Sequence, residues 1–194
     1  MESKKPTCYI VAGPNGAGKT TFSLSSLSKI TNCTRYINVD EIARGLSPLD
    51  VASVQIKAGR LFLEMLKDLV AQRENFTFET TLSGRSYLQH IQRWQADGWR
   101  VILFFLYVPS AQLCESRVAA RVAAGGHNVP GESIIRRYSR SIRNLFEFAE
   151  TCDRTFCLDN SSSRPVPIFE KAKGKPYHIS NQTLFDKMQK ECSL

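Results

Sequence analysis

Short apolar stretches alternate along the chain with longer segments in which apolar residues recur every three or four positions. Stretches of about four to eight apolar or β-branched residues are typical of strands in a buried sheet, whereas the longer spacing is typical of amphipathic helices. The apolar stretches predict five β-strands, at Thr7–Ala12, Arg35–Val39, Phe76–Glu79, Val101–Val108 and Arg154–Asp159.

The segments between these strands carry helix signals. Ser47 is placed as an N-cap, with Pro48 in the first turn and Asp50 three residues after the cap. Ser83 is placed as the cap of a helix that ends at Asp97-Gly98, where glycine suits the carboxyl end. Further helices are expected over residues 18–29, 110–124 and 132–150, and the polar tail predicts one short strand and a helix around 184–189.

Strands that alternate with helices form βαβ units, which build a parallel sheet covered by helices on both faces. We therefore expect an α/β fold of three layers, with a mainly parallel sheet of five or slightly more strands. The 194 residues suit one domain. Within residues 1–194 we expect a core at about 7–161, a helical lid at about 110–150 and a short extension at 162–194.

The composition is that of an ordinary globular protein, with 42% hydrophobic and 23% charged residues. The longest apolar run, Val101–Val108, is too short for a membrane helix, and no signal peptide is recognisable. Six cysteines are scattered without CxxC pairs, which indicates reduced thiols rather than a disulfide framework or a zinc site. These features predict a cytoplasmic protein with no membrane partner.

The net charge of +8 comes from 26 basic and 18 acidic residues. A basic protein can bind nucleic acid or a polyphosphate ligand, so the position of the charge matters more than its total. From Arg117 to Arg143 there are six arginines and one acid, Glu132. Because these arginines are not interleaved with exposed aromatic residues, nucleic acid is the less favoured partner.

The segment GPNGAGKT, which follows the first predicted strand, matches GxxxxGK[ST] at every fixed position. Its glycines allow backbone N–H groups to converge on phosphate oxygens, and the following helix directs its positive end to the same place. Lys19 is expected to reach the β- and γ-phosphates, and the Thr20 hydroxyl to bind magnesium. The predicted nucleotide-binding residues are Gly13, Pro14, Asn15, Gly16, Ala17, Gly18, Lys19, Thr20 and Thr21.

Two acids follow predicted strands at the edge where an open α/β sheet binds ligands: Asp40 after the second strand and Glu79 at the end of the third. Such a carboxylate can take the proton of an attacking hydroxyl, which is the role of the base in phosphoryl transfer. Asp40 is equally consistent with a helix N-cap, and Glu79 with an exposed strand end. There is no NKxD motif, and no strand ends in the usual hydrophobic run plus the Asp that coordinates magnesium in switch GTPases, which disfavours a GTPase switch.

The arginine-rich segment is split by a loop that contains Gly125, Gly126 and Gly131. Arg117 and Arg121 are four residues apart and so share one helix face. On the second helix, arginines are expected opposite an apolar face made of Ile135, Tyr138, Ile142 and Leu145. The pair of helices is consistent with a lid that brings guanidinium groups to a transferring phosphate, or with a solvated basic face.

Five segments together, GPNGAGKTT, NVDEIARGLSP, FETTLSG, RVAARVAAGGHNVP with IIRRYSRSIRNL, and LDNS, resemble the zeta-toxin family of P-loop kinases, in particular its short branch. The resemblance covers about residues 9–161. It implies a kinase-type P-loop fold with a helical lid. It also implies phosphorylation of a UDP-N-acetyl sugar at a hydroxyl, with ATP and Mg²⁺ as cofactors, GTP as the alternative donor and an antitoxin as a candidate protein partner.

The resemblance further implies roles for single residues. Lys19 and Thr20 would hold ATP and magnesium, Asp40 would be the base, and Arg121 with Arg136 or Arg137 would be the lid arginines. Glu79 and Thr81 would contact the sugar nucleotide, and Arg85 is the arginine nearest to this segment. Asn160, after the fifth strand, stands where P-loop kinases often hold the adenine base.

Two other functions are consistent with the same motifs. The first is a kinase with another acceptor, such as a nucleoside, a polynucleotide end or an antibiotic. The second is a binding module in which slow nucleotide hydrolysis drives partner exchange. A kinase needs a base that faces the acceptor and a binding module does not, so Asp40 distinguishes these classes.

Overall fold

A computed structural model describes residues 5–192 of the chain. Its centre is a seven-stranded sheet in the order β2-β3-β1-β4-β5-β6-β7. The strands are β1 (Thr7–Ala12), β2 (Tyr36–Ile37), β3 (Phe76–Thr80), β4 (Arg100–Tyr107), β5 (Arg154–Asp159), β6 (Val166–Ala172) and β7 (Tyr177–Ile179). The first five are parallel and the last two are antiparallel. The predicted α/β fold with a mainly parallel sheet is confirmed.

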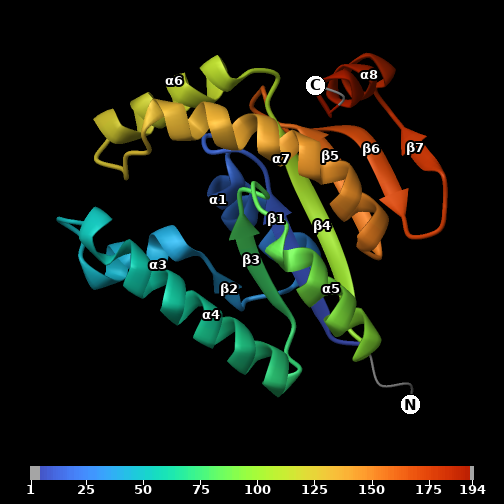
Figure 1. Cartoon of the computed structure of the whole chain (residues 1–194), viewed down its shortest axis with the longest axis horizontal. Coiled ribbons are helices and arrows are strands. Elements are labelled where there is room, and N and C mark those ends of the chain that lie inside the picture. The colour runs from blue at the N-terminus through green and yellow to red at the C-terminus, as the bar shows by residue number, and fades with distance from the viewer. Residues whose placement is uncertain (1–4, 193–194) are drawn as a thin grey trace.

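Helices fill the connections between the strands. They are α1 (Lys19–Phe22), α2 (Ser28–Thr31), α3 (Val39–Leu46), α4 (Gln55–Gln72), α5 (Ser86–Ala96), α6 (Ala111–Ala123), α7 (Gly131–Thr151) and α8 (Gln182–Cys192). A π-helical turn at Ser23–Leu27 joins α1 to α2 without a break. Figure 1 shows α3 and α4 at the β2 end of the molecule, α6 and α7 running together across the top, and α8 at the upper right, above β6 and β7.

Both faces of the sheet are covered. Phe78 of β3 contacts Phe62 of α4 and Trp94 of α5, with ring centroids 6.0 and 6.4 Å away. Phe104 of β4 contacts Phe22 of α1 at 5.7 Å. The strand register puts Phe78 of β3 in the same row as the residue that precedes Phe104 in β4. Successive side chains of a strand point to opposite faces, so Phe104 lies on the face opposite to Phe78. The result is a three-layer core.

Some predicted boundaries are wrong, each for a local reason. The second strand ends at Ile37 because the next residue, Asn38, caps α3. Ser47 is the C-cap of α3 rather than an N-cap, since its N–H donates to the carbonyl of Ala43. Helix α4 starts only at Gln55, after a 3₁₀ turn. Ser83 lies before α5, in a loop where Leu82 has a φ of 58°.

The carboxyl-terminal extension is more ordered than expected. It forms two strands where one was predicted, and α8 is longer than residues 184–189. The extension packs an aromatic cluster against α7, in which Phe146 of α7 meets Phe169 of β6 and Phe185 of α8 at 5.9 and 5.8 Å. The six cysteines are free thiols, five of them buried, in agreement with the prediction of reduced cysteines.

Candidate active site

The phosphate-binding loop connects β1 to α1, as its motif requires. Gly16 and Gly18 have φ values of 79° and 82°, which side chains other than glycine rarely adopt. A Cβ on Gly16 would also lie 2.5 Å from the backbone oxygen of Cys114 in α6. The loop is therefore packed directly against α6, the first helix of the predicted lid, with no room for a side chain between them.

Lys19 is held by the loop that it follows. Its Nζ donates to the carbonyl oxygens of Gly13 and Pro14 at 3.0 and 2.9 Å. Burial lowers the pKa of Lys19, and the nearby carboxylates of Glu79 and Asp40 oppose that shift. Both predicted carboxylates are thus electrostatic neighbours of the P-loop amine.

Glu79 lies at the end of β3, next to the P-loop helix, and four groups donate to it. Oε1 accepts from Ser23 Oγ at 3.0 Å and from the Tyr36 hydroxyl at 2.6 Å. Oε2 accepts from Thr20 Oγ1 at 3.1 Å and from Asn38 Nδ2 at 3.0 Å. The alternative of an exposed strand end does not hold, because this carboxylate is tied to the P-loop helix and to β2.

Asp40 occupies the first turn of α3 and lines the same cavity as Lys19. It is not the N-cap, since Asn38 fills that position and its Oδ1 accepts from the Asp40 N–H at 2.8 Å. Within residues 5–192 the Asp40 carboxylate has no hydrogen bond or ion pair. The two acids therefore differ: Glu79 is fixed by four donors and Asp40 is free to bind a ligand.

The lid helix α6 contributes two arginines. Arg121 Nη2 donates to the carbonyl of His127 at 2.6 Å, so the guanidinium lies under the loop that joins α6 to α7. Arg117 donates to the carbonyls of Asn160 and Ser161 at 2.9 and 2.7 Å. Arg117 thus connects the lid to the loop after β5.

These groups surround one cavity of about 550 Å³. The basic residues come from the P-loop and α6, and the acidic residues from α3 and β3. The lining residues are Asn15, Gly16, Gly18, Lys19, Thr20, Thr21, Asp40, Glu41, Glu79, Arg117, Val118, Arg121, His127, Asn160, Ser162 and Ser163. Sequence motifs scattered over about 150 positions are therefore brought together at the carboxyl edge of the parallel strands.

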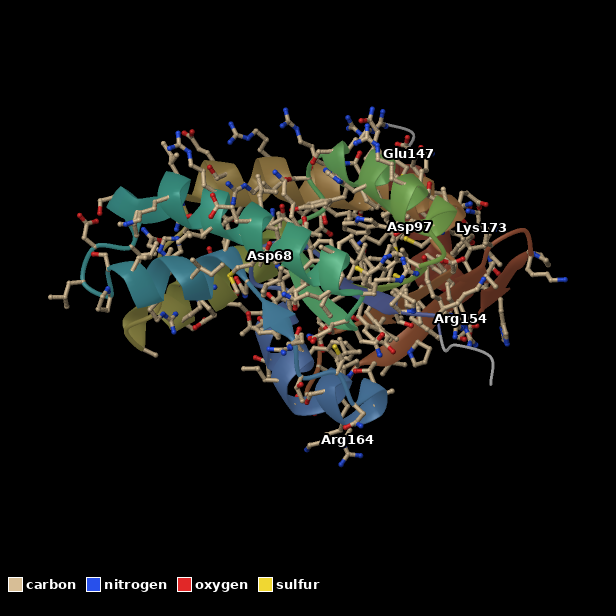
Figure 2. The ribbon with its side chains drawn as sticks, turned by 90° about the horizontal axis from the view of Figure 1, so that it is seen from below. Asp68, Asp97, Glu147, Arg154, Arg164 and Lys173 are labelled. Atoms are coloured by element: carbon tan, nitrogen blue, oxygen red, sulfur yellow. The ribbon has the colours of Figure 1, made fainter. Side chains whose placement is uncertain are left out.

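Four of the residues predicted for catalysis or acceptor binding lie outside this lining, as do Gly13, Pro14 and Ala17 of the P-loop. Thr81 shares a hydrogen bond of 2.8 Å with the Ser83 hydroxyl, in the loop after β3. Arg85 bonds to Asn144 and forms an ion pair of 2.9 Å with Glu147, which Figure 2 labels on α7. Arg136 and Arg137 lie in the first turns of α7. The roles of these four residues stay predictions.

The apolar face of α7 differs from the predicted one at a single position. Tyr138, Ile142 and Leu145 are buried as expected, but Ile135 is half exposed and Ile134 is buried instead. Ile134 precedes Tyr138 by four residues and so lies on the same side of the helix, whereas Ile135 falls beyond the edge of this face.

Asn160 is positioned by the P-loop itself. Its Nδ2 donates to the carbonyl of Ala17 at 2.7 Å, and its predicted contact with a nucleobase stays a prediction. The sequence reasoning missed Ser23, Tyr36 and Asn38 around Glu79. A cap signal exists for Asn38, since asparagine two residues before an acid often starts a helix, but no pattern identifies the other two.

Within residues 5–192, no three His, Cys, Asp or Glu side chains form a group that could hold a metal ion by themselves. Over the same part of the chain, no helix combines the length and the apolar character needed to cross a membrane.

Comparison with known proteins agrees with this architecture. The chain is 29% identical over 126 residues to an uncharacterized protein of Haemophilus influenzae, covering 65% of this chain and 88% of that protein. The structure of the present chain is similar to that of the AvrRxo1-ORF1:AvrRxo1-ORF2 complex with sulphate ions, with a TM-score of 0.76 at 14% identity. That match covers 96% of this chain and 64% of the other, so this chain spans less than two thirds of that relative.

Two further solved structures share the fold. The PezAT toxin–antitoxin system of Streptococcus pneumoniae matches with a TM-score of 0.63 at 16% identity, over 100% of this chain and 88% of the other. The Pnkp1/Rnl/Hen1 RNA repair complex matches with a TM-score of 0.60 at 16% identity, and the match covers 86% of this chain and 50% of the other. At these identities the likeness establishes the fold alone.

The family comparison is more specific than the structural one. The sequence profile described as "Zeta toxin" matches residues 1–164, which include the P-loop, both carboxylates, the lid and the loop after β5. The resemblance inferred from five short motifs is therefore confirmed over most of the chain. With its P-loop kinase fold and this match, the protein belongs to the zeta toxin family.

Proposed function

We propose that this protein is an ATP-dependent phosphotransferase that moves the γ-phosphate of ATP to a hydroxyl group of a small acceptor. The observation that supports this best is the shared cavity. Its lining includes the cations Lys19, Arg117 and Arg121 together with the carboxylates of Asp40 and Glu79. Phosphoryl transfer needs this combination, because cations stabilise the phosphates while a carboxylate handles the acceptor proton.

The proposed reaction forms a bond between the acceptor oxygen and the γ-phosphorus. The bond from that phosphorus to the β,γ-bridging oxygen breaks, ADP leaves with the bond's electrons, and the acceptor proton passes to Asp40. Asp40 suits this role because its carboxylate lines the cavity and has no partner within residues 5–192. Most of the remaining catalysis would be positioning and charge stabilisation.

A magnesium ion fits the donors at the P-loop. Thr20 Oγ1 and Glu79 Oε2 lie 3.1 Å apart, and hydroxyl and carboxylate oxygens are the ligands that Mg²⁺ prefers. We propose that Thr20 holds the ion together with ATP. When bound, magnesium neutralises charge on the β- and γ-phosphates.

For the acceptor we propose a UDP-N-acetyl sugar, and for a protein partner an antitoxin. Both proposals rest on membership of the zeta toxin family, and the similar structure from Streptococcus pneumoniae is itself that of a toxin–antitoxin system. Asp40 would face the sugar hydroxyl. Thr81 and Arg85, in the loop after β3, would contact the remainder of the acceptor, and Arg136 or Arg137 would join Arg121 when the lid closes.

A transfer assay tests the proposal directly. The purified full chain is incubated with γ-labelled ATP, Mg²⁺ and one acceptor: UDP-N-acetylglucosamine, a nucleoside, or an oligonucleotide with a 5′-hydroxyl. Label is expected on the sugar nucleotide. Label on another acceptor would support a kinase but contradict the proposal of a sugar nucleotide as acceptor. Phosphate released only to water would contradict the proposal of a phosphotransferase.

A further inference from the structure

Asn38 connects the two carboxylates of the site. Its Oδ1 accepts from the backbone N–H of Asp40 at 2.8 Å, which caps helix α3. Its Nδ2 donates to Glu79 Oε2 at 3.0 Å and to the Tyr36 hydroxyl at 2.9 Å. The side chain is 7% exposed, so these bonds form away from solvent. One buried amide therefore joins the start of α3 to the ends of β2 and β3.

The partners fix the orientation of this amide. With the oxygen and nitrogen exchanged, Oδ1 would face the carboxylate of Glu79, and Nδ2 would face the N–H of Asp40. The first contact would then join two acceptors and the second would join two donors, so neither could be a hydrogen bond. Asn38 must therefore present its donor to Glu79 and its acceptor to Asp40.

Glu79 is tied into the site by its hydrogen bonds. Each of its two oxygens accepts two of them. Tyr36 contributes as a donor, because burial and the carboxylate of Glu79 raise its pKa and keep the phenol protonated.

Asp40 differs in spite of its closeness to this network. Its backbone is fixed by Asn38, but its carboxylate has no partner within residues 5–192 and lines the cavity. Two acids in such different environments divide the chemistry between them, since only the unpartnered one can accept a proton from a ligand.

We propose that Asn38 is a positioning residue of the site: it ties Glu79 to the P-loop and sets the first turn of α3, so that Asp40 alone faces the acceptor hydroxyl. This inference rests on the proposed phosphotransferase function. Asn38 touches no reacting atom, and its effect passes through the placement of the two carboxylates.

A helix cap without this coupling is the alternative. Aspartate caps helices about as well as asparagine, so Asn38→Asp would be harmless if capping were the only role. In the coupled site the same substitution replaces a donor by a second carboxylate next to Glu79. Two carboxylates in contact share one proton, so the pKa of the pair is raised.

The sign of the pH effect follows from that raised pKa. At low pH the shared proton restores a hydrogen bond between position 38 and Glu79. As the pH rises through the pKa of the folded pair, the proton is lost and the charges repel, so stability falls. The Tm of Asn38→Asp should therefore be close to that of the wild type at about pH 5. At about pH 8 it should be lower than that of the wild type by more than about 4 °C.

The chain offers a matched control in Asn181, whose Oδ1 accepts from the Leu184 N–H at 3.1 Å and caps α8. The experiment compares Asn38→Asp with Asn181→Asp by thermal melts and by kcat across this pH range. For Asn38→Asp, kcat relative to the wild type should fall by more than about tenfold as the pH rises. For Asn181→Asp, the Tm and kcat relative to the wild type should not change with pH.

A second variant keeps the test decisive if Asn38→Asp does not fold. Tyr36→Phe removes one donor to Glu79 without touching the cap or adding charge, and it should lower kcat with little change in the KM for ATP. Asn38 is only a cap if Asn38→Asp behaves like Asn181→Asp in the melts and kcat does not depend on position 38. The melts need no acceptor, so a wild type that transfers no phosphate counts against the proposed function alone.

Discussion

Single side chains in this site are placed by contacts that the motif does not reveal. Lys19 is turned onto the carbonyls of Gly13 and Pro14, within the loop that would wrap the phosphates of ATP. Its charge lies in the cavity that also contains Asp40 and Glu79. The amine thus lies at the place where the motif puts the phosphates of a nucleotide.

We expect Lys19→Ala to lower kcat for phosphoryl transfer by more than about 100-fold, because it removes a cation from the site of developing charge. ATP affinity should also weaken, as measured by isothermal titration. The Tm should change little, since the described partners of Nζ are two carbonyls of a loop at the cavity edge. Turnover at the wild-type rate in a folded Lys19→Ala variant would contradict the assignment of the P-loop.

The sequence predicted the identities of the P-loop residues and of both acids, because each follows a fixed position relative to a strand. It did not separate base from cap at Asp40. That distinction depends on Asn38, whose side chain takes the cap and leaves the carboxylate unpartnered. Nor could a pattern show that Glu79 accepts hydrogen bonds from two segments that are distant from it in the chain.

At the scale of elements, α6, the glycine-containing loop and α7 form the segment that was predicted to be a lid. A Cβ on Gly126 would lie 2.5 Å from Arg121 Cγ, so the loop folds closely onto this arginine. The guanidinium meanwhile donates to His127 in the same loop. Arg121 is therefore both packed against this loop and hydrogen-bonded to it.

Arg121→Ala should lower kcat more than it raises the KM for ATP, because a lid arginine acts mainly on the charge of the transition state. Arg140→Ala is the matched control, an exposed arginine of α7 outside the cavity lining, and should leave both constants unchanged. Steady-state kinetics at varied ATP concentration gives both values. A rise in KM with kcat intact would show that Arg121 only binds ATP in the ground state.

Apolar periodicity located both lid helices to within a residue or two, but it did not show which arginines face the nucleotide. Arg117 and Arg121 line the cavity, whereas Arg136 and Arg137 do not. The reason is geometric: periodicity identifies the buried face of a helix, and the direction of the remaining faces depends on how the two helices are packed.

At the scale of the whole molecule, the extension completes the sheet. Strand β6 pairs with β5, and the Arg154–Glu170 ion pair joins these strands through a hydrogen bond of 2.6 Å from Nε (Figure 2 labels Arg154). The aromatic rings of β6, β7 and α8 bury the end of α7. The family match stops at residue 164, before these elements begin.

We expect a chain truncated after Arg164 to lose cooperative folding, because β5 would become an exposed edge and Phe146 would lose its aromatic partners. Loss of a single aromatic residue from such a cluster, as in Phe169→Ala, should cost about 3–5 kcal/mol. Thermal melting and size-exclusion chromatography measure both effects. A soluble truncated chain that melts like the full one would show that the extension is a separate unit rather than part of one domain.

The central claim is that Asp40 takes the acceptor proton, and the rate of Asp40→Asn tests it most directly. Asn keeps the size of the side chain, and the loss of one acid from the first turn of α3 should cost only about 0.3–1 kcal/mol of stability. With fold and ATP binding retained, kcat for phosphoryl transfer should fall by about 10²–10⁴-fold. A folded, ATP-binding Asp40→Asn variant that transfers phosphate at the wild-type rate would contradict the claim.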